Sequence, residues 1–348
     1  MTGKRTKFSP SFASFGRTAV LALCSAAWFF QLGVPARADP TITTFDPPGS
    51  IFTQPGGINA NDEVAGQYQD AQQATHGFVR TFDGSITTFD VSGASTTAAL
   101  AINDNGAVTG IFGSMTPGGR AQGHGFVRAP DGTITTFDPP GSILTSPAGI
   151  NKKGAVVGAF QDAGLAVHGF VRKAKGKIKT FDAPGAVGTG AAAINSHGAI
   201  TGAYIDSNGA EHGYVRKKRG AFTTFDVADA IDTEPVGIDD QGVITGTYFD
   251  QSSNEHGFVR DTDGTITTFD AFGTTTEVRG IDGLGSTTGT GQIDVDENAG
   301  FLRAADGLIT EITVPGAFNT DCVGIGGNDL IVGLFVDSNG THGFIRNP

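Results

Sequence analysis

A sevenfold internal repeat constrains this chain more than any other feature of its sequence. The string His-Gly-Phe-Val-Arg, or a close variant of it, recurs at intervals of 43 to 48 residues. The copies begin at His76, His124, His168, His212, His256, Ala299 and His342. Self-similarity at a fixed period of this length is typical of repeat architectures, in which each copy forms one supersecondary unit.

Each repeat contains four short apolar runs that are separated by turn residues. The runs are rich in Ile, Val, Thr and Phe and lack helical spacing, so we predict four strands per repeat. Four strands in about 44 residues, repeated radially, make the blade of a propeller. The sequence therefore predicts an all-β fold, a seven-bladed β-propeller of four-stranded blades.

The phase of the repeat predicts how the ring closes. The first motif after residue 40 is a lone fourth strand, residues 42–46, and the last is a lone third strand, residues 342–346. We expect the N-terminal strand to pair in the last blade and supply its missing fourth strand. Such pairing removes exposed sheet edges.

Gly-containing turns between the third and fourth strands predict the register of each hairpin. Asp83-Gly84 and its counterparts suit two-residue type I′ turns. That turn would place Phe78 opposite Phe89, with an aromatic pair at the same rung in the four following repeats.

The first 38 residues carry the features of a secretory signal peptide. Basic residues precede an uncharged, mostly apolar run over residues 18–34, and Ala36-Arg37-Ala38 matches a small-x-small cleavage site. We predict cleavage after Ala38, leaving one domain, residues 39–348, that is secreted to the periplasm or the extracellular space without a membrane span. A membrane anchor is the alternative, although the apolar run is short for one.

Charge and cysteine content restrict the partners of the mature chain. Cleavage would remove five basic residues and no acidic ones, so the net charge would fall from −12 to −17. Such an acidic surface repels phosphate backbones, so we expect no nucleic-acid partner. Cys322 would be the only cysteine left, which excludes an internal disulfide. We expect a monomer.

The motifs resemble those of a known family. Gly-Ile-Asn-x-x-Gly-x-Val-x-Gly followed by His-Gly-Phe-Val-Arg is similar to the bacterial extracellular repeat proteins called HAF, after a His-Ala-Phe tripeptide. The similarity covers nearly all of the mature chain, although Gly replaces the Ala of the tripeptide and Arg stands where the family often has Trp. The resemblance implies export and a propeller, and it implies no activity.

Strand direction divides the loops between two faces. The hairpins within the first-second and third-fourth strand pairs lie on one face, the hairpin face, and the remaining loops lie on the other, the loop face. Aspartates end the second and fourth strands, so we expect an acidic loop face that takes a cation, a glycan or an extracellular protein. The candidate binding residues are Asp206, Asn208, Asp250 and Asp337.

The histidines of the repeat invite a zinc hypothesis, which geometry disfavours. They occupy one position in six different blades, and zinc needs its ligands within about 2 Å. We predict a structural role in which each histidine bonds the aspartate that ends the fourth strand of its blade, as His76 with Asp90. The repeat arginines, such as Arg80, are expected to face threonine across the hairpin and pair with neighbouring blades; an anion-binding ring is the alternative.

Calcium is the one metal that the sequence suggests. Asp294, Asp296 and Asn298 alternate oxygen ligands as calcium loops do. The glycine spacing and the final glutamate of an EF-hand are missing, so an Asx turn is the alternative. No other cofactor is predicted.

No catalytic motif is present, so the leading interpretation is an exported, non-catalytic binding scaffold. The alternative is a lyase or hydrolase that acts on an extracellular polymer through groups converging on the channel. The stretches 97–102 and 190–194 of the first strands are small and apolar, which gives the enzyme little support. A structural protein of the cell envelope is a third interpretation.

Overall fold

The computed structural model describes residues 40–115, 121–273 and 275–348, so the predicted signal peptide and its cleavage site lie outside the described residues. The described chain consists of β-strands and one short 3-10 helix, η1 Gly327–Asp329. Among these residues, no helix is both long and apolar enough to cross a membrane.

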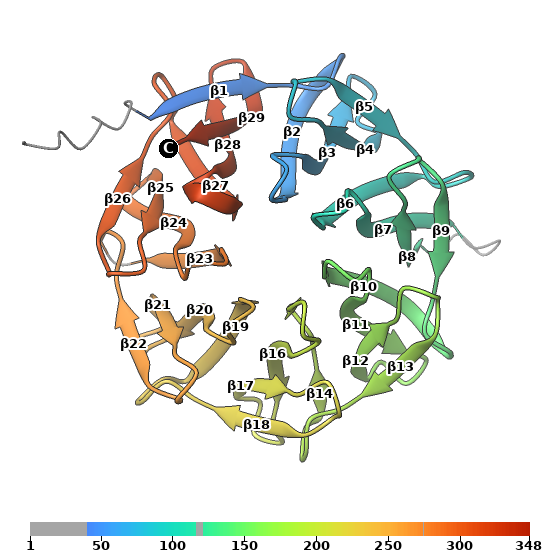
Figure 1. Cartoon of the computed structure of the whole chain (residues 1–348), viewed down its shortest axis with the longest axis vertical. Helices are drawn as coiled ribbons and strands as arrows, with labels where there is room; N and C mark the ends of the chain where they lie inside the picture. Colours follow the sequence, from blue (N-terminus) through green and yellow to red (C-terminus); the bar gives the residue numbers. More distant parts are fainter. Residues whose placement is uncertain (1–39, 116–120, 274) are drawn as a thin grey trace, which may run out of the picture. The chain divides into compact units, whose positions relative to one another are not determined.

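The strands follow the repeat, in antiparallel groups (Figure 1). The first three groups are β2 Ser50–Ile58, β3 Val64–Asp70, β4 Thr75–Arg80 and β5 Ile86–Phe89; β6 Thr96–Ile102, β7 Val108–Met115, β8 Ala121–Arg128 and β9 Ile134–Phe137; and β10 Ser142–Ile150, β11 Val156–Asp162, β12 Val167–Arg172 and β13 Ile178–Phe181.

The next three groups continue the pattern. They are β14 Gly188–Thr189, β15 Ala193–Ile194, β16 Ile200–Ile205, β17 Glu211–Arg216 and β18 Phe222–Phe225; β19 Asp232–Ile238, β20 Ile244–Phe249, β21 Glu255–Arg260 and β22 Ile266–Phe269; and β23 Thr276–Ile281, β24 Thr287–Asp294, β25 Glu297–Arg303 and β26 Ile309–Ile312. Figure 1 shows the groups around a common centre, with the first strand of each group innermost.

The two ends of the described chain meet in one group. β27 Asn319–Ile325, β28 Ile331–Asp337 and β29 Gly340–Asn347 pair in order, and β1 Thr41–Phe45 pairs antiparallel with β29. Thr41 lies opposite Asn347 and Phe45 opposite Gly343. Short parallel contacts, such as Phe52 with Thr341, join some neighbouring groups into one sheet, while the groups that begin at β14, β19 and β23 are separate sheets.

The predicted hairpin register is wrong by one residue. Phe78 lies opposite Thr88, and Phe89 lies opposite Gly77. The turn is longer than expected: Gly84 N donates to Thr81 O, and Thr81 N donates to Ser85 O. Within this turn only Gly84 has a positive φ, 88°, whereas type I′ needs two such residues. The connection is therefore a type I turn closed by a glycine bulge, and the slip places Phe78 and Phe89 on opposite faces of the hairpin instead of on the same face.

The aromatic pairs form between repeats as a result. Phe89 meets Phe126 of the next repeat edge to face, with ring centroids 5.9 Å apart, and Phe45 meets Phe78 at 6.0 Å. The third-strand aromatics are fully buried and form the centre of the core between groups. They are Phe78, Phe126, Phe170, Tyr214, Phe258, Phe301 and Phe344.

The arginines also join neighbouring repeats, although their predicted threonine partners are wrong. Arg80 lies opposite Ile86, and its guanidinium carbon lies 5.2 Å from the ring centroid of Phe45 in the adjacent group. The same stacking places Arg216 4.4 Å from the ring centroid of Phe181. These cation–π contacts join the outer strand of one repeat to the third strand of the next.

Candidate functional site

The innermost strands place one variable side chain at an equivalent position in every repeat. A buried threonine near the start of each strand comes first, and the variable residue follows it directly. These residues are Gln54, Ala98, Ser146, Gly190, Glu234, Glu277 and Asp321. Three consecutive repeats therefore present a carboxylate near the loop face. These residues were not predicted from the sequence, because the small apolar stretches 97–102 and 190–194 do not show how the residue after the threonine varies from repeat to repeat.

Glu234 and Glu277 line a cavity with a third glutamate. The cavity has a volume of about 280 Å³, and Glu255, at the start of β21, completes its set of carboxylates. Arg279 also lines it and forms an ion pair of 2.8 Å with Glu277. We call this the acidic cavity. Its three carboxylates face one cationic side chain within the cavity.

Burial and mutual repulsion change the protonation of these groups. Burial raises the pKa of Glu234 to about 7, and the negative charges of neighbouring carboxylates add to the shift. Burial also raises the pKa of Glu255, with a further contribution from Glu277 and an opposing one from Arg279. Near neutral pH, Glu234 can therefore bind a cation, or donate or accept a proton.

A second, apolar cavity adjoins the acidic one and shares Glu234 and Val236 with it. It has a volume of about 570 Å³ and lies among the groups that begin at β10, β14 and β19. Its lining includes three apolar side chains that are exposed to solvent, Leu165, Val167 and Val187. The loop face thus carries carboxylates beside an accessible apolar surface.

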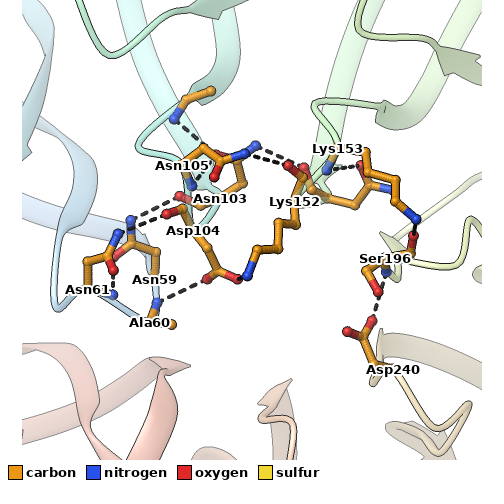
Figure 2. Close-up of polar contacts among 12 residues, drawn as sticks. Asn59, Ala60, Asn61, Asn103, Asp104, Asn105, Lys152, Lys153, Ser196 and Asp240 are labelled. Atoms are coloured by element: carbon orange, nitrogen blue, oxygen red, sulfur yellow. Dashed lines mark hydrogen bonds and ion pairs between the residues drawn. The ribbon is translucent and has the colours of Figure 1, made fainter.

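The opposite end of the central space has a different chemistry. The first hairpins of all seven repeats line a pocket of about 560 Å³ on the hairpin face. Asparagine amides connect the repeats around it: Asn59 Nδ2 donates to Asn103 O at 2.9 Å, and Asn103 Nδ2 donates to Asn151 O at 2.8 Å (Figure 2). Asn151 and Asn195 continue the series to Asp239. These amides are used in holding the repeats together.

A second layer of contacts surrounds this asparagine series (Figure 2). Asp104 accepts a hydrogen bond from Ala60 N at 3.1 Å and lies 3.7 Å from Lys152 Nζ. Lys153 Nζ donates to Ser196 O at 2.6 Å, and Ser196 N donates to Asp240 at 2.8 Å. The partners of these charged groups lie in the neighbouring repeat, which indicates a framework role.

The structure places each repeat histidine against the predicted aspartate. His76 Nδ1 lies 2.9 Å from Asp90, and His342 Nδ1 lies 2.7 Å from Asp46 across the two ends of the chain. The other pairs are His124 with Asp138, His168 with Asp182, His212 with Asp226 and His256 with Asp270. In five of the six, Nε2 also lies within 3.6 Å of the aspartate that ends the second strand; His124 instead contacts Ser114.

The predicted binding residues Asp206, Asn208, Asp250 and Asp337 lie in loops on the loop face, where they shape the turns. Asp206 accepts hydrogen bonds from the backbone N–H groups of Asn208 and Ala210. Backbone and side-chain hydrogen bonds from Asn254 lower the pKa of Asp250 to about 2. A binding role for these residues stays a prediction.

Asp294 and Asn298 lie on the two strands of a tight hairpin, and Asp296 lies in its turn. Asp294 lies opposite Glu297, and its carboxylate accepts from Val295 N at 2.7 Å. Asn298 N donates to Asn319 of the next repeat. Within the described ranges, no group of three or more His, Cys, Asp or Glu side chains is arranged to hold a metal ion. A calcium site at Asp294, Asp296 and Asn298 stays a prediction.

Comparison with known proteins shows the type of fold. No family model matches the chain, and no curated protein matches it by sequence. Among solved structures, it is similar to TolB from Acinetobacter baumannii, with a TM-score of 0.50 and 13% identity over 70% of this chain and 61% of that one. The chain thus spans less than two thirds of that relative's length.

Two further structures extend the comparison. A prolyl endopeptidase gives a TM-score of 0.55 at 9% identity over 86% of this chain and 47% of that chain. An uncharacterised protein, lmo1340 from Listeria monocytogenes EGD-e, gives 0.50 at 12% identity over 85% and 92% of the two chains. These similarities show an all-β, propeller-like fold and leave the function open.

Proposed function

We propose that this chain is an exported, non-catalytic binding scaffold, built as a closed propeller of seven blades in the manner of the HAF repeat proteins. Seven sequence copies and the pairing of β1 with β29 support the blade number and the closure. The apolar run before Ala38 supports export. Closure leaves the loop face free for a ligand, because stability comes from contacts between repeats.

The ligand is a basic, partly apolar peptide segment of an extracellular partner. The observation that carries this proposal is the pair of cavities on the loop face that share Glu234. A lysine or arginine side chain of the ligand would enter the acidic cavity, and a neighbouring apolar side chain would cover Leu165 and Val187. A bound cation stabilises half-buried carboxylates that repel one another more than it stabilises exposed ones, because it offsets both their desolvation and their mutual repulsion.

Calorimetry with short synthetic peptides tests this function. A peptide of alternating lysine and leucine should bind, and one of alternating glutamate and leucine should not. The affinity of the lysine-leucine peptide should rise between pH 6 and pH 8, because Glu234 loses its proton in that range. Glu255→Gln should weaken binding about fivefold, the value of one ion pair of about 1 kcal/mol.

The matched control is Glu311→Gln, which neutralises an exposed glutamate on β26, away from both cavities. Affinity within about twofold of wild type is expected for this variant. Equal losses in the two variants, or binding that is independent of pH across this range, would contradict the proposal.

A channel-centred enzyme is the second candidate, and the raised pKa of Glu234 favours it. A carboxyl group that is half protonated near pH 7 is suited to general acid or base catalysis. Incubation with extracellular polysaccharides would reveal such an activity as shorter products, which Glu234→Gln should abolish. If the polysaccharides are not shortened and the lysine-leucine peptide binds, the result favours the binding scaffold over the enzyme.

A further inference from the structure

Basic residues are concentrated in one stretch of this acidic chain. Residues 152–219 contain eleven of the eighteen Lys and Arg residues that follow Ala38, and only four acidic residues. Those four are Asp162, Asp182, Asp206 and Glu211, and each lies at the loop-face end of its strand or loop. The hairpin face of the groups that begin at β10 and β14 therefore carries a positive charge, whereas the chain as a whole is acidic.

These basic side chains surround a cavity between the two groups. It has a volume of about 400 Å³, and its lining includes Lys153 and Arg216 as well as Lys173, Lys179, Lys218 and Arg219. The last four, Lys173, Lys179, Lys218 and Arg219, are exposed, and within the described part of the chain none of them has a carboxylate at ion-pair distance. Small and aliphatic side chains, such as Ala155 and Ile200, also line it. We call this the basic groove.

The same groove recurs two repeats later with the opposite character. Between the groups that begin at β19 and β23 lies a cavity of about 440 Å³, lined by the equivalent positions. Asp261 stands there in place of Lys173, Thr267 in place of Lys179, and Ala305 in place of Lys218. The fold therefore makes the groove without lysine, so the lysines are not required for its packing.

We propose that the basic groove binds a segment of an acidic polysaccharide, through its carboxylate or sulfate groups. Positive side chains from two successive hairpins would contact successive charges along a linear polymer. Lysine suits this task because its ammonium group is a compact, strongly hydrated point charge on a flexible stem. The loop face and its cavities take no part in this binding.

Other anionic partners fit the groove less well. Single-stranded nucleic acids stack successive bases on several aromatic side chains, and the groove's lining includes one aromatic ring, that of His197, and no Phe, Tyr or Trp. Membrane binding favours apolar side chains that enter the lipid, and none of the exposed large apolar residues lines the groove. A concave site between two hairpins also fits a polymer chain better than a flat bilayer.

Titration of the protein residues 39–348 with a fluorescent oligomer of galacturonic acid tests the proposal. The groove variant combines Lys173→Asp with Lys218→Ala, which installs residues that the fold already holds at equivalent positions. The control variant combines Lys175→Asp with Lys217→Ala, which makes the same change in charge on the same face outside the groove. The groove variant should lose about tenfold in affinity or more, and the control less than about threefold.

The reverse exchange provides an independent arm. Asp261→Lys combined with Ala305→Lys should create a second site and raise the number of oligomers bound. Equal losses in the groove and control variants would overturn the proposal, because they would indicate binding to the general field of the surface. Tighter binding to a DNA oligonucleotide or to anionic vesicles than to the galacturonate oligomer would overturn it too. The same holds if the groove variant changes only self-association, measured by sedimentation.

Discussion

At the scale of single residues, the glycine of the His-Gly-Phe motif has a steric cause. The ring of the fourth-strand phenylalanine lies over it: a Cβ atom at Gly125 would lie 2.6 Å from Cζ of Phe137. That ring cannot withdraw freely, because it also packs against Phe170 at 5.8 Å between centroids. The sequence showed that glycine recurs here. The reason became visible only with the true register, which puts Phe137 opposite Gly125.

Gly125→Ala should therefore destabilise the fold by about 1–3 kcal/mol, the usual cost of overpacking. Gly283→Ala is the matched control, since a Cβ atom there would meet nothing within 4 Å. Chemical denaturation of both variants measures the free energy of unfolding. Equal midpoints for Gly125→Ala and wild type would show that Phe137 moves aside at no cost.

At the scale of elements, β1 is the strand that joins the two ends of the chain. It pairs with β29, and its Phe45 packs against Phe78 of the first group. Asp46, which follows it, accepts a hydrogen bond from the Thr53 hydroxyl at 2.6 Å and lies 2.7 Å from His342 Nδ1. The pairing was predictable from the phase of the repeat, because a lone fourth strand and an incomplete last group complement each other.

Deletion of residues 39–46 should lower the melting temperature by about 10 °C or more, because it removes a strand whose contacts reach two groups. A chain that begins at residue 41 keeps β1 and serves as the control. A synthetic peptide of residues 39–50, added in excess, should restore part of the loss by mass action. A truncated chain that melts like the control would contradict the role of β1.

At the scale of the whole molecule, stability should fall as the pH rises from 5 to 8. Hydrogen bonding to Asp182 raises the pKa of His168. In four other repeats burial lowers the pKa of the histidine, but the hydrogen bonds and negative charges of the aspartates outweigh this effect. The pKa values of those histidines are therefore also raised. A histidine whose pKa is higher in the folded state stabilises the fold when it is protonated. This stabilisation is complete below the unfolded-state pKa of about 6.5, and it is lost as the pH rises through the folded-state pKa.

Glu234 acts in the same direction, since its folded pKa of about 7 exceeds its ordinary value. Melting temperatures at pH 5 and pH 8 measure this change in stability. His168→Asn should reduce the difference between the two melting temperatures by a few degrees. His197→Asn is the control, because His197 is exposed in a first-second hairpin on the other face. If His168→Asn leaves the difference in melting temperature between pH 5 and pH 8 unchanged, the histidine–aspartate contacts do not cause the pH dependence.

The sequence alone determined the strands, their grouping, the pairing of the chain's two ends and the histidine–aspartate contacts. These features repeat, so each copy supports the same local interpretation. Only the tertiary structure decided the hairpin register, because turn length depends on backbone torsions that Asp-Gly and Lys-Gly pairs leave open. It also decided the sites. Glu234, Glu255 and Glu277, and likewise Lys173 and Lys218, lie far apart in the sequence and meet because radial packing brings equivalent positions of neighbouring repeats together.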